Sequence, residues 1–180
     1  TSGLTLIDIG SIPANDSFAS AQTISGRSAV VTATNAQATL EPGEPLILGH
    51  AGGKSLWYRW TAPGSGRFQF GASSDGFDPL LAVYTGTALN ALTLVGASDD
   101  ADAESGGVSN YSGSLVTVNA TAGTTYFLQL EGAARNGLPP PTAPFTLTVN
   151  DSVWQGLAGN NLTSAPTIGP DGSVYIGSSD

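Results

Sequence analysis

The sequence predicts an all-β protein folded as an antiparallel, jelly-roll-like β-sandwich of about eight to ten strands. Short apolar segments with period-two alternation recur roughly every ten residues, and each is bounded by Gly, Pro, Asn or Ser. β-branched residues are frequent, and only 11% of the residues are charged. A length of 180 residues suits one sandwich with short appendages.

Nine segments carry the strand pattern. In chain order they are residues 4–9, 29–34, 55–61, 67–72, 80–85, 92–98, 114–119, 125–131 and 145–149. In the last of them Phe145, Leu147 and Val149 alternate with threonines, which indicates one buried and one exposed face. By the same alternation Phe68 and Phe70 are expected to face the core.

The aromatic segment around Trp57 must also place one side in the core. Tyr58 and Trp60 share a side with Leu56, so we expect these three to be buried. Trp57 falls on the opposite side with Arg59. Because aromatic rings stack on sugars, Trp57 is a candidate ligand-binding residue, although ordinary packing is the simpler alternative.

The remaining pattern sets the domain organisation. Residues 15–21 carry the helical signal, one or two turns that Asn15 or Asp16 would cap. Three prolines at 139–141 predict an extended loop before the last strand. We therefore expect an N-terminal extension or strand over residues 1–14, the sandwich over 15–150, and a linker with one short β segment over 151–180.

The charge composition restricts the partners. Fourteen acidic residues against five basic ones give a formal net charge of -9, which argues against nucleic acid and anionic membranes. With no Cys, disulfides and thiolate metal sites are impossible. No apolar run is long enough to span a membrane. Carboxylates remain available for a hard cation such as Ca²⁺.

A first candidate calcium site combines two loops. Glu41 and Glu44 lie in a proline-restrained loop before the aromatic strand, and they are expected to meet Asn15 and Asp16 at the edge of the sandwich. Ca²⁺ takes six to eight oxygen ligands, and carboxylates with an amide can supply several of them. The alternative is a pair of solvated loop carboxylates.

A second candidate calcium site is the acidic segment that contains Asp99, Asp100 and Asp102, with Glu104 close behind. A bound cation would relieve the repulsion among these carboxylates. The segment is not a helix-loop-helix calcium loop, since Ser105 stands where that motif needs glycine. A solvated acidic loop remains the alternative.

Catalysis is not expected. His50 is the only histidine, and the sequence has no Gly-x-Ser-x-Gly elbow to pair with it. No pair of carboxylates is predicted to face across an apolar groove, as a glycosidase would need. The sequence therefore favours a protein that is not an enzyme.

Five ordered motifs resemble the bacterial pre-peptidase C-terminal domain. They are Asn-Asp-Ser-Phe at 15–18, Glu-Pro-Gly-Glu-Pro at 41–45, Ser-Leu-Trp-Tyr-Arg-Trp-Thr-Ala-Pro at 55–63, Phe-Asp-Pro-Leu-Leu-Ala-Val-Tyr-Thr-Gly at 77–86 and Ala-Gly-Thr-Thr-Tyr at 122–126. The resemblance implies a sandwich that accompanies secreted enzymes and surface proteins, often stabilised by calcium and without catalysis. In the better-known branch an acidic residue precedes the Asn-Asp pair, whereas Pro13 and Ala14 precede it here.

Residues 164–180 resemble one turn and strand of a pyrroloquinoline-quinone-type propeller repeat, and one repeat cannot close a propeller. The resulting expectation is a non-catalytic, calcium-stabilised accessory or adhesion module of a larger secreted or cell-surface bacterial protein, with a polysaccharide or an extracellular protein as partner. The alternative is a structural subunit of an extracellular filament or surface assembly, in which residues 4–9 or 174–176 add a strand to a neighbour's sheet.

Overall fold

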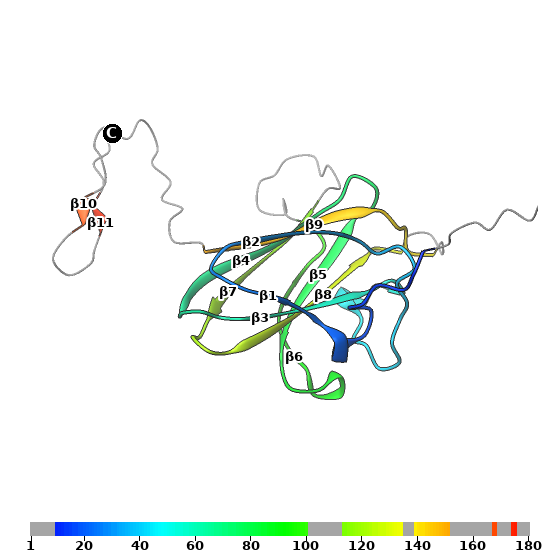
Figure 1. Cartoon of the computed structure of the whole chain (residues 1–180), viewed down its shortest axis with the longest axis horizontal. Helices are drawn as coiled ribbons and strands as arrows, with labels where there is room; N and C mark the ends of the chain where they lie inside the picture. The colour runs from blue at the N-terminus through cyan, green and yellow to red at the C-terminus, as the bar shows by residue number, and fades with distance from the viewer. Residues whose placement is uncertain (1–9, 101–112, 135–138, 152–166, 169–173, 176–180) are drawn as a thin grey trace, which may run out of the picture.

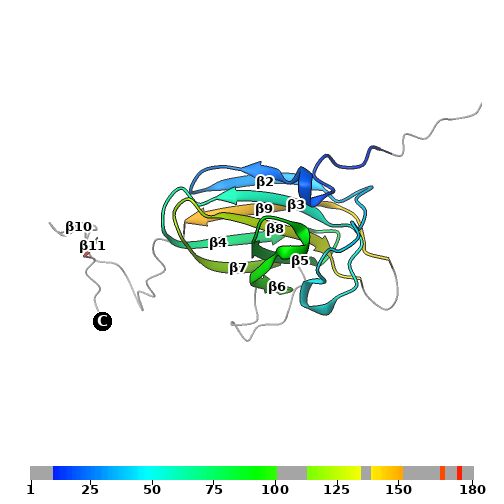
Figure 2. The ribbon, with the colours of Figure 1, turned by 90° about the horizontal axis from the view of Figure 1, so that it is seen from below.

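The computed structural model describes residues 10–100, 113–134, 139–151, 167–168 and 174–175, and it shows the predicted β-sandwich (Figures 1 and 2). A five-stranded sheet has the order β1-β3-β8-β5-β6, and a four-stranded sheet has the order β2-β9-β4-β7. The strands of the sandwich are β1 Gln22–Ile24, β2 Ala29–Thr34, β3 Leu56–Thr61, β4 Gly66–Ser73, β5 Pro79–Thr85, β6 Thr93–Ser98, β7 Gly113–Ala120, β8 Thr125–Gly132 and β9 Pro144–Asp151. β10 (Thr167–Ile168) and β11 (Val174–Tyr175) form a two-stranded antiparallel sheet of their own.

Every predicted strand that falls within the described residues is confirmed. Eight predicted segments match β2 to β9 within two residues, and the segment predicted at 4–9 lies outside the described residues. The sequence missed β1, which has three residues and pairs in parallel with β3 through Thr23 and Arg59. A strand of that length is too short to show alternation.

The main core lies between the two sheets. β3 contributes Leu56, Tyr58 and Trp60, all fully buried as predicted, and β4 contributes the buried Phe68 and Phe70. The Trp60 ring centroid lies 4.7 Å from that of Phe68 and 5.3 Å from that of Phe70. Trp60 Nε1 donates to the Gly26 carbonyl at 2.8 Å, so the polar atom of this large side chain is satisfied.

A second, smaller core covers the other face of the five-stranded sheet. Trp57, Leu80 and Tyr84 project from β3 and β5 into it, and Ile47 closes it from the loop that precedes β3. Phe18 packs edge-on against Trp57, with 5.2 Å between ring centroids. Part of β3 and most of β5 are therefore buried on both faces.

In place of the one or two helical turns predicted over residues 15–21, the structure has a single 3₁₀ turn, η1 (Phe18–Ser20). Its N-terminal flanking residue is Ser17, whose side chain makes no capping hydrogen bond, so the expectation that Asn15 or Asp16 caps this turn is wrong. Two further 3₁₀ turns, η2 (Ile47–Gly49) and η3 (Leu89–Ala91), lie in loops. No helix among the described residues has the length and apolar character needed to cross a membrane.

Candidate functional site

The Asn15–Asp16 pair fastens the N-terminal loop to the sandwich. Asn15 Nδ2 donates to the Trp57 carbonyl at 3.0 Å, and Trp57 N donates back to the Asn15 carbonyl at 2.9 Å. Asp16 accepts from Thr39, through the backbone N–H at 2.6 Å and through the hydroxyl at 2.7 Å. Both residues therefore join loop segments that are distant in sequence.

Glu41 and Glu44 have similar roles. Glu41 Oε2 accepts from the backbone N–H of Phe18 at 2.9 Å. Glu44 Oε1 accepts from Trp57 Nε1 at 2.9 Å, and Glu44 Oε2 accepts from the Ser55 hydroxyl. Burial raises the pKa of Glu44 above its ordinary value.

These contacts do not fit the first predicted calcium site. The carboxylates of Asp16, Glu41 and Glu44 accept hydrogen bonds from the protein's own donors, and the Asn15 side chain donates to a backbone carbonyl. Within the described part of the chain, no group of three or more acidic or histidine side chains is placed to hold a metal ion. As arranged, the four residues clamp loops to the sheet.

Replacing Asp16 with alanine is therefore expected to lower the free energy of unfolding by about 1–3 kcal/mol, because the N–H of Thr39 loses a charged acceptor. Chemical denaturation with and without Ca²⁺ would measure the loss. If Asp16 only holds loops to the sheet, the loss of stability should be the same in both conditions. A loss that appears only with Ca²⁺ would restore Asp16 as a metal ligand.

Trp57 is not available as a stacking platform. Its side chain has no exposed surface, because the loops that carry Phe18 and Ile47 cover this face of β3. Alternation predicted correctly that Trp57 lies on the face opposite Trp60. The prediction that this face offers Trp57 to a ligand is wrong, since the loops add a second core there.

A buried acid that the sequence analysis did not single out lies beside these clamps. Glu131, on β8, is 1% exposed, and its Oε2 accepts from the backbone N–H of Gly53 at 3.1 Å. A Cβ at Gly52 would lie 1.9 Å from the same oxygen, so a larger residue there would displace the Glu131 carboxylate. Burial raises the pKa of Glu131 to about 7, and the charge of Glu44 adds to this shift. In the sequence, the Gly-Gly pair at 52–53 was the one feature that could have indicated a close approach of the backbone to another group.

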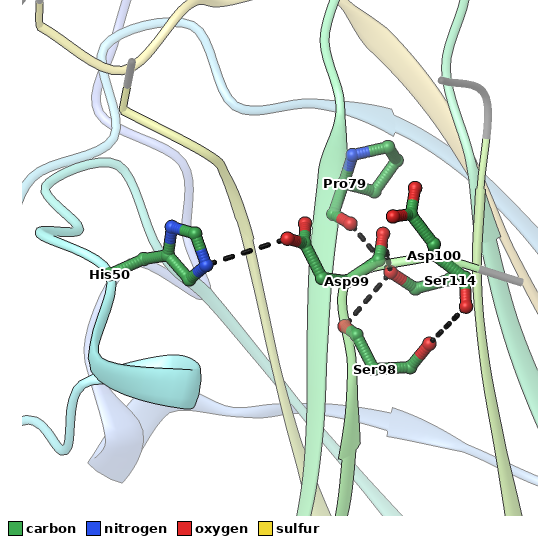
Figure 3. Close-up of polar contacts among 6 residues, drawn as sticks. All are labelled: His50, Pro79, Ser98, Asp99, Asp100 and Ser114. Atoms are coloured by element: carbon green, nitrogen blue, oxygen red, sulfur yellow. Dashed lines mark hydrogen bonds and ion pairs between the residues drawn. The ribbon is translucent and has the colours of Figure 1, made fainter. Parts of the chain in front are cut away.

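The second predicted calcium segment begins at a corner where the two sheets meet (Figure 3). Ser114, on β7, is 2% exposed, and three backbone carbonyl oxygens surround its hydroxyl oxygen. These are the oxygens of Pro79 at 2.5 Å, Ser98 at 2.9 Å and Asp99 at 3.1 Å. Figure 3 shows the Asp99 carboxylate directed toward His50, whose Nε2 lies 3.4 Å from Asp99 Oδ2.

This arrangement concentrates oxygen acceptors. A hydroxyl has one proton, so Ser114 donates fully to only one of the three carbonyls. Oxygen ligands that lie 2.3–2.6 Å from a shared Ca²⁺ are roughly 3 Å from one another, which is the spacing around the Ser114 hydroxyl. Asp100 is exposed next to this corner, and Asp102 lies outside the described residues. As at the first site, the described residues here include no group of three acidic or histidine side chains placed to hold a metal ion. The carbonyl and hydroxyl oxygens around Ser114 are the ligands that this corner could offer a hard cation.

The fold and these sites define an all-β sandwich protein. No family model matches the chain, and the search of curated proteins finds no match. Among solved structures, the chain is similar to the pre-peptidase C-terminal domain of a collagenase from Bacillus anthracis, at 14% identity and a TM-score of 0.43, over 72% of this chain and 94% of that one. It is similar to PliG, a periplasmic inhibitor of g-type lysozyme from Aeromonas hydrophila, at 13% identity and a TM-score of 0.43, over 72% and 95%.

A protein from Sulfurospirillum deleyianum is similar at 10% identity and a TM-score of 0.35, over 70% of this chain and 99% of that one. At these values the likenesses carry no argument about function. None of the three comparisons supports the resemblance of residues 164–180 to a propeller repeat.

Proposed function

We propose that this chain is a non-catalytic, calcium-stabilised accessory or adhesion module of a larger secreted bacterial protein. The oxygen-rich corner around Ser114 carries the proposal. The ion would be held there by carbonyl oxygens of Pro79, Ser98 and Asp99, by the Ser114 hydroxyl and by acidic side chains of the segment that begins at Asp99.

The position of this corner gives the ion a structural role. Pro79 and Ser98 belong to β5 and β6 of the five-stranded sheet, whereas Ser114 belongs to β7 of the four-stranded sheet. A cation bound to oxygens of all three strands would link the two sheets at one edge of the sandwich. Such a link favours the folded chain, because the unfolded chain does not bring these oxygens together.

The contacts of the ionisable side chains support a role without catalysis. Glu44 is held by Trp57 and Ser55, and Asp16 is held by Thr39. The carboxylates of Glu44 and Asp16 therefore stabilise loops, a structural role that suits a rigid binding module. The partner we propose is a polysaccharide or an extracellular protein.

A calcium titration followed by thermal melting tests the proposal. Ca²⁺ at a hundred times its dissociation constant is expected to stabilise the folded chain by roughly 2.7 kcal/mol, if it binds only that state. Asp99→Asn and Ser114→Ala should abolish most of this gain, whereas the matched control Asp16→Asn should keep it. A melting temperature that does not change between chelator and saturating Ca²⁺ would contradict the proposal.

One observation favours the structural-subunit alternative. β6 lies at the edge of the five-stranded sheet among the described residues, and its Leu94 and Val95 are 55% and 42% exposed. β6 itself (Thr93–Ser98) contains no charged residue, so this described edge offers a place for strand addition. The donor predicted at residues 4–9 lies outside the described part, and Val174–Tyr175 pairs with Thr167–Ile168. Polymers in light scattering at high concentration would favour this alternative.

A further inference from the structure

The exposed part of the five-stranded sheet holds a groove of about 420 Å³ on its outer face. Its lining residues come from β1, β3, β8 and the turn after β5, and they are Thr23, Arg59, Thr61, Gly86, Thr87, Thr125 and Phe127. Strand register places Thr23 beside Arg59 and Arg59 beside Phe127, in a row across three strands. Thr61 and Thr125 form the next row, with 2.9 Å between their hydroxyl oxygens.

This groove begins where the loop cover ends. On the same face of β3, Trp57 is buried under the loops, whereas Arg59 and Thr61 are exposed. Phe127 stands at the boundary: its ring packs against Phe18, with 4.5 Å between centroids, and the residue remains partly exposed. The groove therefore combines an aromatic edge with a polar floor on rigid strands.

Arg59 gives the groove a specific charge. Arg27 is engaged by Asp151 in an ion pair, and Lys54 donates to the Ala38 carbonyl at 3.3 Å. Arg59 donates from Nε to the Thr23 hydroxyl at 2.8 Å, and no acidic side chain in the described part forms an ion pair with it. The contact with Thr23 orients a guanidinium whose charge is not neutralised by a described neighbour.

We propose that this groove binds a saccharide that carries a carboxylate, such as a uronic acid unit. A guanidinium recognises a carboxylate through paired N–H donors, the partly exposed ring of Phe127 suits the C–H face of a sugar, and threonine hydroxyls can donate to or accept from sugar hydroxyls. The inference rests on the proposed function as an accessory module and gives that module a ligand class.

A saccharide suits these features better than an acidic peptide does. The groove offers one guanidinium and four threonine hydroxyls, a polar surface with a single site for an anion. The net charge of -9 repels a ligand with many closely spaced carboxylates, and a peptide of consecutive acidic residues is such a ligand. A uronic acid unit presents one carboxylate among several hydroxyls.

Calorimetric titration with short neutral oligosaccharides that carry a single uronic acid unit tests the inference, at about 0.15 M salt and with chelator present so that calcium bridging is excluded. Arg59→Gln is expected to weaken binding about tenfold or more, since a hydrogen-bonded charge pair contributes roughly 1.5–3 kcal/mol. The methyl esters of the same oligosaccharides, which lack the carboxylate charge, should bind the unchanged protein more weakly by a similar factor. The matched control Arg67→Gln, at an exposed arginine of the other sheet, should leave binding unchanged.

Three outcomes would overturn the inference. They are no binding of the oligosaccharides, equal losses in Arg59→Gln and Arg67→Gln, and equal binding of a triglutamate peptide. If the groove does not bind the oligosaccharides, the calcium-dependent shift in melting temperature should still be seen. If the calcium proposal is wrong, that shift should be absent, but the saccharide binding measured in chelator should remain. The two proposals are therefore tested separately.

Discussion

Replacing Trp57 with alanine is expected to lower the free energy of unfolding by about 3–5 kcal/mol, the range for removing a large aromatic side chain from a core. The indole is fully buried, packs edge-on against Phe18 and donates to Glu44. Its loss would leave a cavity in the smaller core and would deprive the partly buried carboxylate of Glu44 of one of its donors. Denaturant unfolding followed by circular dichroism would measure the change.

Two variants make this result specific. Trp57→Phe keeps an aromatic ring in the core but loses the indole N–H to Glu44 and part of the ring volume, so a smaller loss of about 1–3 kcal/mol is expected. Leu94→Ala truncates a side chain that is 55% exposed, and it should change stability by less than about 1 kcal/mol. If Trp57→Ala were no worse than Leu94→Ala, the smaller core would contribute little to stability.

Replacing Glu131 with glutamine is expected to stabilise the protein at pH 8 by about 3 kcal/mol and to change stability little at pH 4. The folded chain keeps the Glu131 proton up to a pKa of about 7, whereas the unfolded chain releases it near the ordinary value of 4.5. The stability that this group contributes is therefore complete below about pH 4.5 and is lost as the pH rises through 7. A shift of this size corresponds to about 3 kcal/mol.

Glutamine suits this test because its carbonyl oxygen can still accept from the N–H of Gly53, and it carries no charge to repel Glu44. Denaturant unfolding at pH 4, 6 and 8 should give the largest difference from the unchanged protein at pH 8. Asp75→Asn removes an exposed carboxylate and serves as the control. An equal effect of Glu131→Gln at pH 4 and pH 8 would show that ionisation of Glu131 is not the cause.

Most of the sandwich was predictable because its strands bury one face and alternate accordingly. β9 is the clearest case, where Phe145, Leu147 and Val149 are buried between more exposed neighbours. Alternation failed for Trp57, since loops bury the second face of β3 there. A loop that folds back over a sheet depends on tertiary contacts that local periodicity does not record.

The candidate sites were less predictable for a related reason. Proximity in sequence grouped Asn15 with Asp16 and Glu41 with Glu44, but each of these side chains forms a hydrogen bond with another segment: Asn15 donates to a backbone carbonyl, and the three carboxylates accept. The corner around Ser114 uses backbone carbonyls, which every residue carries and no pattern of residue types reveals. In the sequence, only the acidic residues Asp99 and Asp100 pointed to this corner.

The location of a bound ion tests the account most directly. Crystals grown with Ca²⁺ and measured at long wavelength would reveal calcium by its anomalous scattering. We predict a peak within ligand distance, roughly 2.4 Å, of the carbonyl oxygens at the Ser114 corner. A peak among Asp16, Glu41 and Glu44 instead, or no peak at saturating Ca²⁺, would contradict the account.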